Sequence, residues 1–238
     1  MNIRRAWVGV GMWTALLLVV CLHMSWAAPG PAIEGRVTIV DREGKPKPRH
    51  DVAVVFLDEL EHPTRFAVPT QHAAIRQTNK RFDPEVLPIL VGTTVDFPND
   101  DTIFHNVFSL SKARPFDLGI YAQGTSRSVT FSQPGLVKVY CNIHPQMIAY
   151  ILVLPNPHFT TTDLQGRFVL PDVPLGEATV RSWYPASREQ PEQKVVVTAQ
   201  GIQDLNLNIV ESLRFEIREE TIAIQHKNKW GQDYPAKY

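Results

Sequence analysis

The chain alternates short runs of β-branched and aromatic residues with clusters of Gly, Pro, Asn and Asp, and this pattern limits the fold more than any other feature. Many short runs split by turn-forming residues are typical of β-sandwiches and barrels. The body of the chain shows no sustained helical period, and we expect a short helix or a loop only at 111–124. The sequence therefore predicts an all-β fold. The clearest runs are GRVTIV (35–40), VAVVFL (52–57), LVKVY (136–140), AYILVL (149–154) and DLNLNIV (204–210).

The N-terminus has the pattern of a secretory signal. Arg4 and Arg5 precede an apolar run at 6–22, and small residues, among them Ala27, follow that run. We expect removal of residues 1–27 and export to the periplasm, with no stable membrane insertion of the mature chain. An uncleaved anchor is the alternative, because the apolar run reaches the lower limit for a bilayer span.

Net charge and the number of Cys and Met residues limit the functions that the chain can have. The 238-residue chain has a formal net charge of zero, and residues 1–27 hold two arginines and no acidic residue, so the mature chain carries a charge of minus two. A chain this close to neutral lacks the electrostatic footprint of a nucleic-acid-binding protein. Cleavage also leaves one cysteine, Cys141, and one methionine, Met147. Because cysteines of exported proteins usually pair, an unpaired one suggests an intermolecular disulfide or a reactive role.

One short loop, VYCNIHPQMIAY (139–150), brings Cys141, His144 and Met147 together. Two imidazoles, a thiolate and a weak axial Met form the ligand set of a blue-copper electron-transfer site. His105, in FPNDDTIFHNVFSL, is the best source of the second imidazole, 36 residues before Cys141. A neighbouring strand of a sandwich places such a residue beside the loop. The sequence therefore predicts one mononuclear copper ion held by His105, Cys141, His144 and Met147.

Other chemistries use some of the same residues. Zinc binds Cys and His, but structural zinc sites favour Cys-rich spacings and rarely include Met. A nucleophilic Cys141 paired with a histidine is a second alternative, although it leaves Met147 without a role. Attachment of c-type haem needs a Cys-x-x-Cys-His motif, which the sequence lacks. We therefore expect an electron carrier and not an enzyme.

Two longer segments resemble the cupredoxins, most closely the amicyanin and plastocyanin type. FSQPGLVKVYCNIH (131–144) is similar to the run that leads into the Cys and His ligands of that family, and Cys-x2-His-x2-Met has the amicyanin loop length. RFDPEVLPILVGTTVDFPNDDTIFHNV (81–107) is similar to the segment that contains the first His ligand. More broadly, the chain resembles exported cupredoxin-like proteins labelled with methylamine utilisation. The resemblance implies the same four copper ligands, a dehydrogenase as electron donor and a cytochrome as acceptor.

The flanking segments resemble a different family, the carboxypeptidase-regulatory or transthyretin-like β-sandwich. EGRVTIVDREGKPKPRHDVAVVFL (34–57) is similar to its first half, and TTDLQGRFVLPDVPLGEATVRSWYP (161–185) to its second half. We therefore expect a cupredoxin Greek-key sandwich nested in this second sandwich, or joined to it in series. The expected parts are a signal peptide (1–27), the two halves of the outer sandwich (31–66 and 156–211), the cupredoxin domain (67–155) and a C-terminal tail (212–238).

Two functions other than electron transfer stay open. A periplasmic copper carrier or storage protein binds the metal without cycling it, although such carriers favour exposed Met-rich or His-rich ligands. A structural or interaction module is the other alternative, since transthyretin-like sandwiches often serve as add-on domains. The compact loop that contains Cys141 favours redox cycling.

Overall fold

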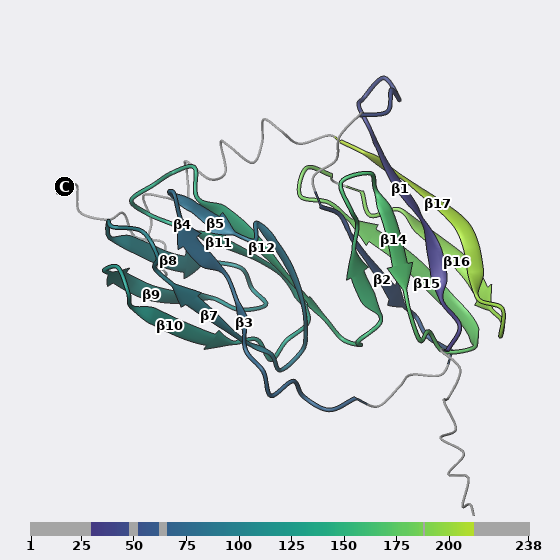
Figure 1. The fold of residues 1–238 in the computed structure, drawn as a ribbon, viewed down its shortest axis with the longest axis horizontal. Coiled ribbons are helices and arrows are strands. Elements are labelled where there is room, and N and C mark those ends of the chain that lie inside the picture. The colour runs from purple at the N-terminus through teal and green to yellow at the C-terminus, as the bar shows by residue number, and fades with distance from the viewer. Residues whose placement is uncertain (1–29, 48–51, 62–65, 188, 212–238) are drawn as a thin grey trace, which may run out of the picture.

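The computed structural model describes residues 30–47, 52–61, 66–187 and 189–211. Within these residues every regular element is a β-strand, so the predicted all-β fold is confirmed (Figure 1). The expectation of a helix or loop at 111–124 is wrong, because β9 (Phe116–Tyr121) occupies the middle of that stretch. The predicted signal peptide and C-terminal tail lie outside the described residues. No helix in the described part of the chain is long and apolar enough to span a membrane.

Two sheets face each other in the sandwich at the right of Figure 1, which we call the outer sandwich. Their strands come from both ends of the described chain, and the core between them is built from Val, Ile, Leu and aromatic side chains such as Val37, Val180 and Phe168. In one sheet the order is β14 (Arg167–Leu170), β1 (Ile33–Val40), β17 (Ile202–Val210); in the other it is β13 (Phe159–Thr161), β2 (Val54–Asp58), β15 (Gly176–Trp183), β16 (Glu192–Val197).

The remaining strands form the sandwich at the left of Figure 1, which we call the inner sandwich. Its core includes Phe97, Phe131 and Val139, together with the predicted ligands Cys141 and Met147. A five-stranded sheet has the order β6 (Val86–Leu90), β12 (Ile148–Leu154), β11 (Gly135–Tyr140), β8 (His105–Ser109), β9, and a smaller sheet has the order β10 (Ser126–Thr130), β7 (Thr94–Pro98), β3 (Ala73–Ala74). A hairpin of β4 (Arg76–Thr78) and β5 (Arg81–Asp83) completes it.

The chain leaves the outer sandwich and later returns to it. Strand β1 pairs antiparallel with β14 and parallel with β17, while β2 pairs with β13 and β15. All strands from β3 to β12 pair among themselves in the described residues. This pairing is what a nested arrangement requires, since β1 and β2 add no strand to the inner sandwich. The division into domains at about 66 and 156 stays a prediction.

Strand β12 is buried on both faces because the two sandwiches pack against each other there. Ala149, Ile151 and Val153 point into the inner core. The alternate residues Tyr150, Leu152 and Leu154 point the other way, into a separate apolar cluster with Val54, Phe56 and Trp183 of the outer sandwich. The period of two in a strand sends successive side chains to opposite faces, so this nearly continuous apolar run serves two cores at once.

The tip of the β4–β5 hairpin has a backbone conformation that matters for the site. Asn79 and Lys80 both have positive φ values, 54° and 57°. Two successive left-handed residues make the tight hairpin turn whose twist matches that of the flanking strands, and Asn is one of the residues that tolerates it best. Both residues are exposed, and the turn leaves their backbone N–H groups free to bond a group outside the hairpin.

Candidate metal centre

Three strands deliver the predicted ligands to one end of the inner sandwich. His105 is the first residue of β8, Cys141 follows the last residue of β11, and Met147 precedes β12. Strand β11 lies between the other two: Tyr140 pairs with Phe108 of β8 and with Ile148 of β12. The loop from 141 to 147 therefore turns back beside the start of β8, as the sequence predicts for a ligand carried by a neighbouring strand.

The ligand atoms of His105, Cys141 and His144 converge. Cys141 Sγ lies 3.8 Å from His105 Nδ1 and 3.9 Å from His144 Nδ1, and the two Nδ1 atoms are 3.1 Å apart. A metal with bonds of about 2.0–2.3 Å and three ligands in one plane would separate them by about 3.5–3.8 Å. The three residues thus form a group able to hold one metal ion, with all ligand atoms within 4.8 Å of one another.

Met147 is placed at the base of the same loop. Its side chain is fully buried and belongs to the same core cluster as Cys141. Its backbone N–H donates to the carbonyl of His144 at 2.9 Å, which closes the loop into a turn. The structure therefore brings three predicted ligands into direct proximity and places the fourth at the closing turn of the loop, inside the core.

Burial differs between the two histidines. His105 is fully buried, whereas His144 is half-buried between the exposed residues Ile143 and Pro145. Burial lowers the pKa of His144, and the charges of His105 and Lys80 lower it further, against an opposing effect of Asp101. The lowered pKa favours the neutral imidazole, which is the form that binds a metal.

Backbone N–H groups hydrogen-bond the sulfur of Cys141. Burial raises its pKa, while the N–H groups of Asn106, Ile143 and His144 donate to the sulfur and act in the opposite direction. These donors stabilise a thiolate once a cation replaces the proton. The backbone N–H of Asn106 thereby ties the start of β8 to the loop, while its side-chain amide donates to Asp117 at 2.9 Å.

One functional neighbour was missed at the level of the sequence. The sequence of Asn99, Asp100 and Asp101 is typical of a turn, yet Oδ2 of Asp101 lies 2.7 Å from Nε2 of His105. The signal available was the spacing of four residues in DDTIFH, but Asp100 stands beside Asp101 in the same motif. Asp100 instead pairs with Arg76 at 2.8 Å. Arg76 of β4 thus bonds Asp100, whereas the backbone at the tip of the β4–β5 hairpin bonds Asp101.

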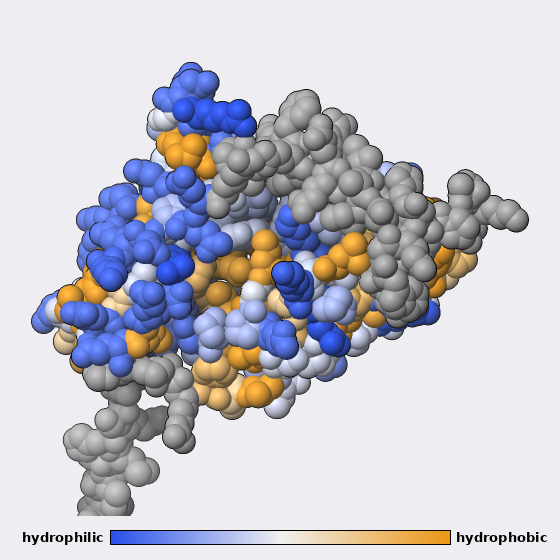
Figure 2. Space-filling view, turned by 180° about the vertical axis from the view of Figure 1, so that it is seen from behind, coloured by the Kyte–Doolittle hydropathy of each residue, from blue (hydrophilic) through white to orange (hydrophobic). Residues whose placement is uncertain are grey.

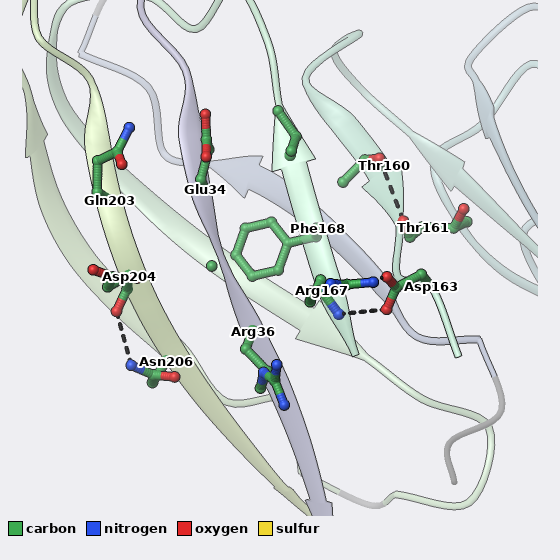
Figure 3. A pocket seen from close by; sticks show the side chains of 12 residues that line it. Glu34, Arg36, Thr160, Thr161, Asp163, Arg167, Phe168, Gln203, Asp204 and Asn206 are labelled. Carbon is green, nitrogen blue, oxygen red and sulfur yellow. Dashed lines mark hydrogen bonds and ion pairs between the residues drawn. The ribbon is translucent and has the colours of Figure 1, made fainter. Parts of the chain in front are cut away.

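A hollow lies elsewhere, on the outer sandwich. Figure 3 shows it over β14, β1 and β17, with Glu34, Arg36 and Asn206 projecting from the sheet. Arg167 already pairs with Asp163 there at 2.8 Å. The visible side of the outer sandwich is mostly hydrophilic (Figure 2). This hollow is separate from the candidate metal centre and shares no residue with it.

Comparisons with known proteins give partial matches. No family model matches the chain, and no curated protein sequence matches it. A copper-containing nitrite reductase from Thermus scotoductus SA-01 is 28% identical over 39% of this chain, with a TM-score of 0.35; the chain spans only 25% of that protein. A purple cupredoxin from Nitrosopumilus maritimus is 28% identical over 34% of this chain and 99% of its own, with a TM-score of 0.32. Amicyanin from Paracoccus versutus is 20% identical over 37% of this chain and 85% of its own, with a TM-score of 0.32.

Proposed function

We propose that this chain is a mononuclear copper protein that carries single electrons. The observation that carries the proposal is the convergence of His105 Nδ1, Cys141 Sγ and His144 Nδ1 at one end of a β-sandwich. Two imidazoles and one thiolate, with a Met nearby, suit copper better than zinc, whose structural sites are closed by four Cys or His ligands. Met147, buried at the base of the loop, is the proposed axial ligand.

The surroundings of the cluster support electron transfer over copper storage. His105, Cys141 and Met147 are fully buried, and strands β8, β11 and β12 fix their backbones on both sides of the loop. Copper in such a site supplies one-electron chemistry, and the protein keeps the ligands in place in both oxidation states. A carrier that releases its metal would need ligands that open to solvent, and here only His144 reaches the surface.

His144 is the proposed point of electron exit. Exposed apolar side chains stand beside the two histidines: Phe104, 59% exposed, precedes His105, and Ile143, 41% exposed, precedes His144. A small apolar surface of this kind, with two exposed side chains, suits a short-lived complex with a redox protein. The proposed partners are a dehydrogenase as donor and a cytochrome as acceptor, carried over from the amicyanin resemblance. The proposed compartment is the periplasm, and the proposed role is that of a carrier and not an enzyme.

The proposed domain arrangement is a cupredoxin domain (67–155) nested in a transthyretin-like sandwich (31–66 and 156–211). The pairing of β1 and β2 with strands from β13 onward supports it. Both sandwiches have a core of their own, as separate domains do.

The test is to add Cu(II) to the purified mature chain and record its visible absorption spectrum, together with copper per chain. We expect one ion and an intense thiolate-to-copper band that disappears in Cys141→Ser. A colourless protein that binds metal would point instead to zinc or to a Cu(I) carrier. A band that survives in Cys141→Ser would contradict the ligand assignment, and absence of metal binding would leave an interaction module.

A further inference from the structure

The buried His105 makes a second contact, away from the metal cluster. Its Nε2 lies 2.7 Å from Oδ2 of Asp101, and the side chains of these residues are 0% and 13% exposed. An ionised carboxylate can only accept a hydrogen bond, so Nε2 must be the nitrogen that carries the proton. In the neutral form of the ring, which is the form that binds a metal, the other nitrogen, Nδ1, then keeps its lone pair, and it is Nδ1 that faces Cys141 and His144.

Asp101 is itself fixed from two directions. The backbone N–H groups of Asn79 and Lys80, at the tip of the β4–β5 hairpin, donate to its two oxygens at 2.6 and 2.9 Å. Its own N–H donates to Oδ1 of Asn99 at 3.0 Å. Asn99 is fully buried, and its side-chain amide donates to the carbonyls of Ile103 and Tyr121. The carboxylate therefore has one orientation, set by the hairpin and by a buried amide.

The geometry points to Asp101 as a positioning residue that selects the metal-binding tautomer of His105 and sets how strongly this histidine donates to the metal. A carboxylate bonded to the distant nitrogen of a ligating histidine fixes the ring and raises its basicity. The negative charge also stabilises Cu(II) more than Cu(I), since Cu(II) carries the larger charge. Asp101 thereby lowers the reduction potential. The effect on potential rests on the proposed function, whereas the tautomer does not.

Neighbouring Asp100 provides a matched control. Asp100→Asn removes the same charge one residue away, from a side chain that is 39% exposed and bonds Arg76. Asp101→Asn keeps the size of the side chain and removes the charge, and Asp101→Ala removes the bond as well. Thermal unfolding of the copper-free variants by circular dichroism shows which of them are folded, and either folded Asp101 variant is sufficient for the comparison.

The first measurement is a ¹⁵N–¹H correlation spectrum of the histidine rings in the copper-free protein. We expect a protected Nε2–H proton on His105 in the wild type and in Asp100→Asn, and loss of its protection in Asp101→Ala. A His105 ring protonated at Nδ1 in the wild type would overturn the inference. This result decides the role of Asp101 whether or not the protein binds copper.

The second measurement is the affinity for Cu(II) and Cu(I) and the reduction potential of each variant. We expect Cu(II) affinity to fall by about 10–100-fold in the Asp101 variants, Cu(I) affinity to fall less, and the potential to rise. Equal shifts in Asp100→Asn would mean that only the overall charge matters, which would overturn the inference. Unchanged values in the Asp101 variants would overturn it too. Absence of the thiolate band in the wild type would instead refute the proposed function. The ring spectrum would still show whether Asp101 sets the tautomer of His105.

Discussion

Tyr150 of the inner sandwich and Trp183 of the outer sandwich are in ring contact, with centroids 5.5 Å apart and planes inclined by 56°. Both side chains are at least 96% buried. The contact lies in the apolar cluster that also holds Leu152 and Val54. Tilted aromatic pairs add to the stabilisation that comes from burial, so this pair links the two sandwiches. Through it the four-stranded sheet of the outer sandwich covers the five-stranded sheet that leads into the loop 141–147.

Trp183→Ala tests this link. Truncation of a buried aromatic side chain costs about 3–5 kcal/mol, and we expect a loss of that size in the free energy of unfolding from urea titration. Val196→Ala, on the exposed face of β16, is the control and should change stability by less than about 0.5 kcal/mol. The copper spectrum of folded Trp183→Ala should match the wild type, because Cys141 lies in the other core. Equal stability of the two variants would show that the sandwiches do not support each other.

Reaction of Cys141 with a thiol reagent tests the burial of the site. The thiol is fully buried and burial raises its pKa, so both access and the thiolate fraction are reduced. We expect the folded copper-free chain to react with dithionitrobenzoate far more slowly than the same chain in guanidinium chloride. Rapid reaction of the folded chain would mean that the loop is open before metal binds.

Met147→Gln tests the axial assignment. Gln is an alternative axial ligand in blue-copper sites, and the axial ligand tunes the potential. We expect this variant to bind one copper ion, to keep its thiolate-to-copper band and to have a lower reduction potential than the wild type, measured by redox titration. An unchanged potential would show that the Met147 sulfur does not face the metal.

Gly35→Ala tests a close approach of two strands in the outer sandwich. A Cβ at residue 35 would lie 2.0 Å from the backbone oxygen of Leu205, where the pairing of β1 with β17 is irregular. A backbone atom cannot move aside as the end of a flexible side chain can, so we expect Gly35→Ala to lower the free energy of unfolding by about 3 kcal/mol. The exposed neighbour Glu34 is the control, since Glu34→Ala should cost less than about 0.5 kcal/mol. Similar stabilities would contradict the close approach.

His158 should make the protein less stable below neutral pH. Burial lowers its pKa, against an opposing effect of Asp172. The unfolded chain, with a pKa near 6.5, therefore binds a proton before the folded chain does as the pH falls. Stability that is present above about pH 6.5 is lost below it, until the folded pKa is passed. We expect the unfolding free energy to fall less between pH 7.5 and 5.5 in His158→Gln than in the wild type. An equal fall of the unfolding free energy in both proteins would show that His158 does not cause the pH dependence.

The strand-rich fold and the closeness of three candidate ligands could be predicted from the sequence, because both depend on local patterns. Cys141, His144 and Met147 share one loop, and the runs that became β1, β2, β11, β12 and β17 show clear β character. Placement of His105 needed only that one strand lie beside another. The roles of Asp101 and Trp183 depend instead on how distant segments pack. The Asp101 contact needs the turn at Asn79, and the Trp183 contact needs the second sandwich, neither of which a local pattern specifies.

The order of strands along the chain has a consequence for how the protein is made. Strands β3 to β12 are synthesised before β13 to β17, while β1 and β2 wait for partners that emerge last. Domains generally fold as units, from the N-terminal end, as a chain emerges. The outer face of β12, with Tyr150 and Leu152, is therefore exposed to water until β15 arrives. In that interval the incomplete chain exposes an apolar sheet face, so we expect a truncated product that ends before Gly176 to aggregate more readily than the whole chain.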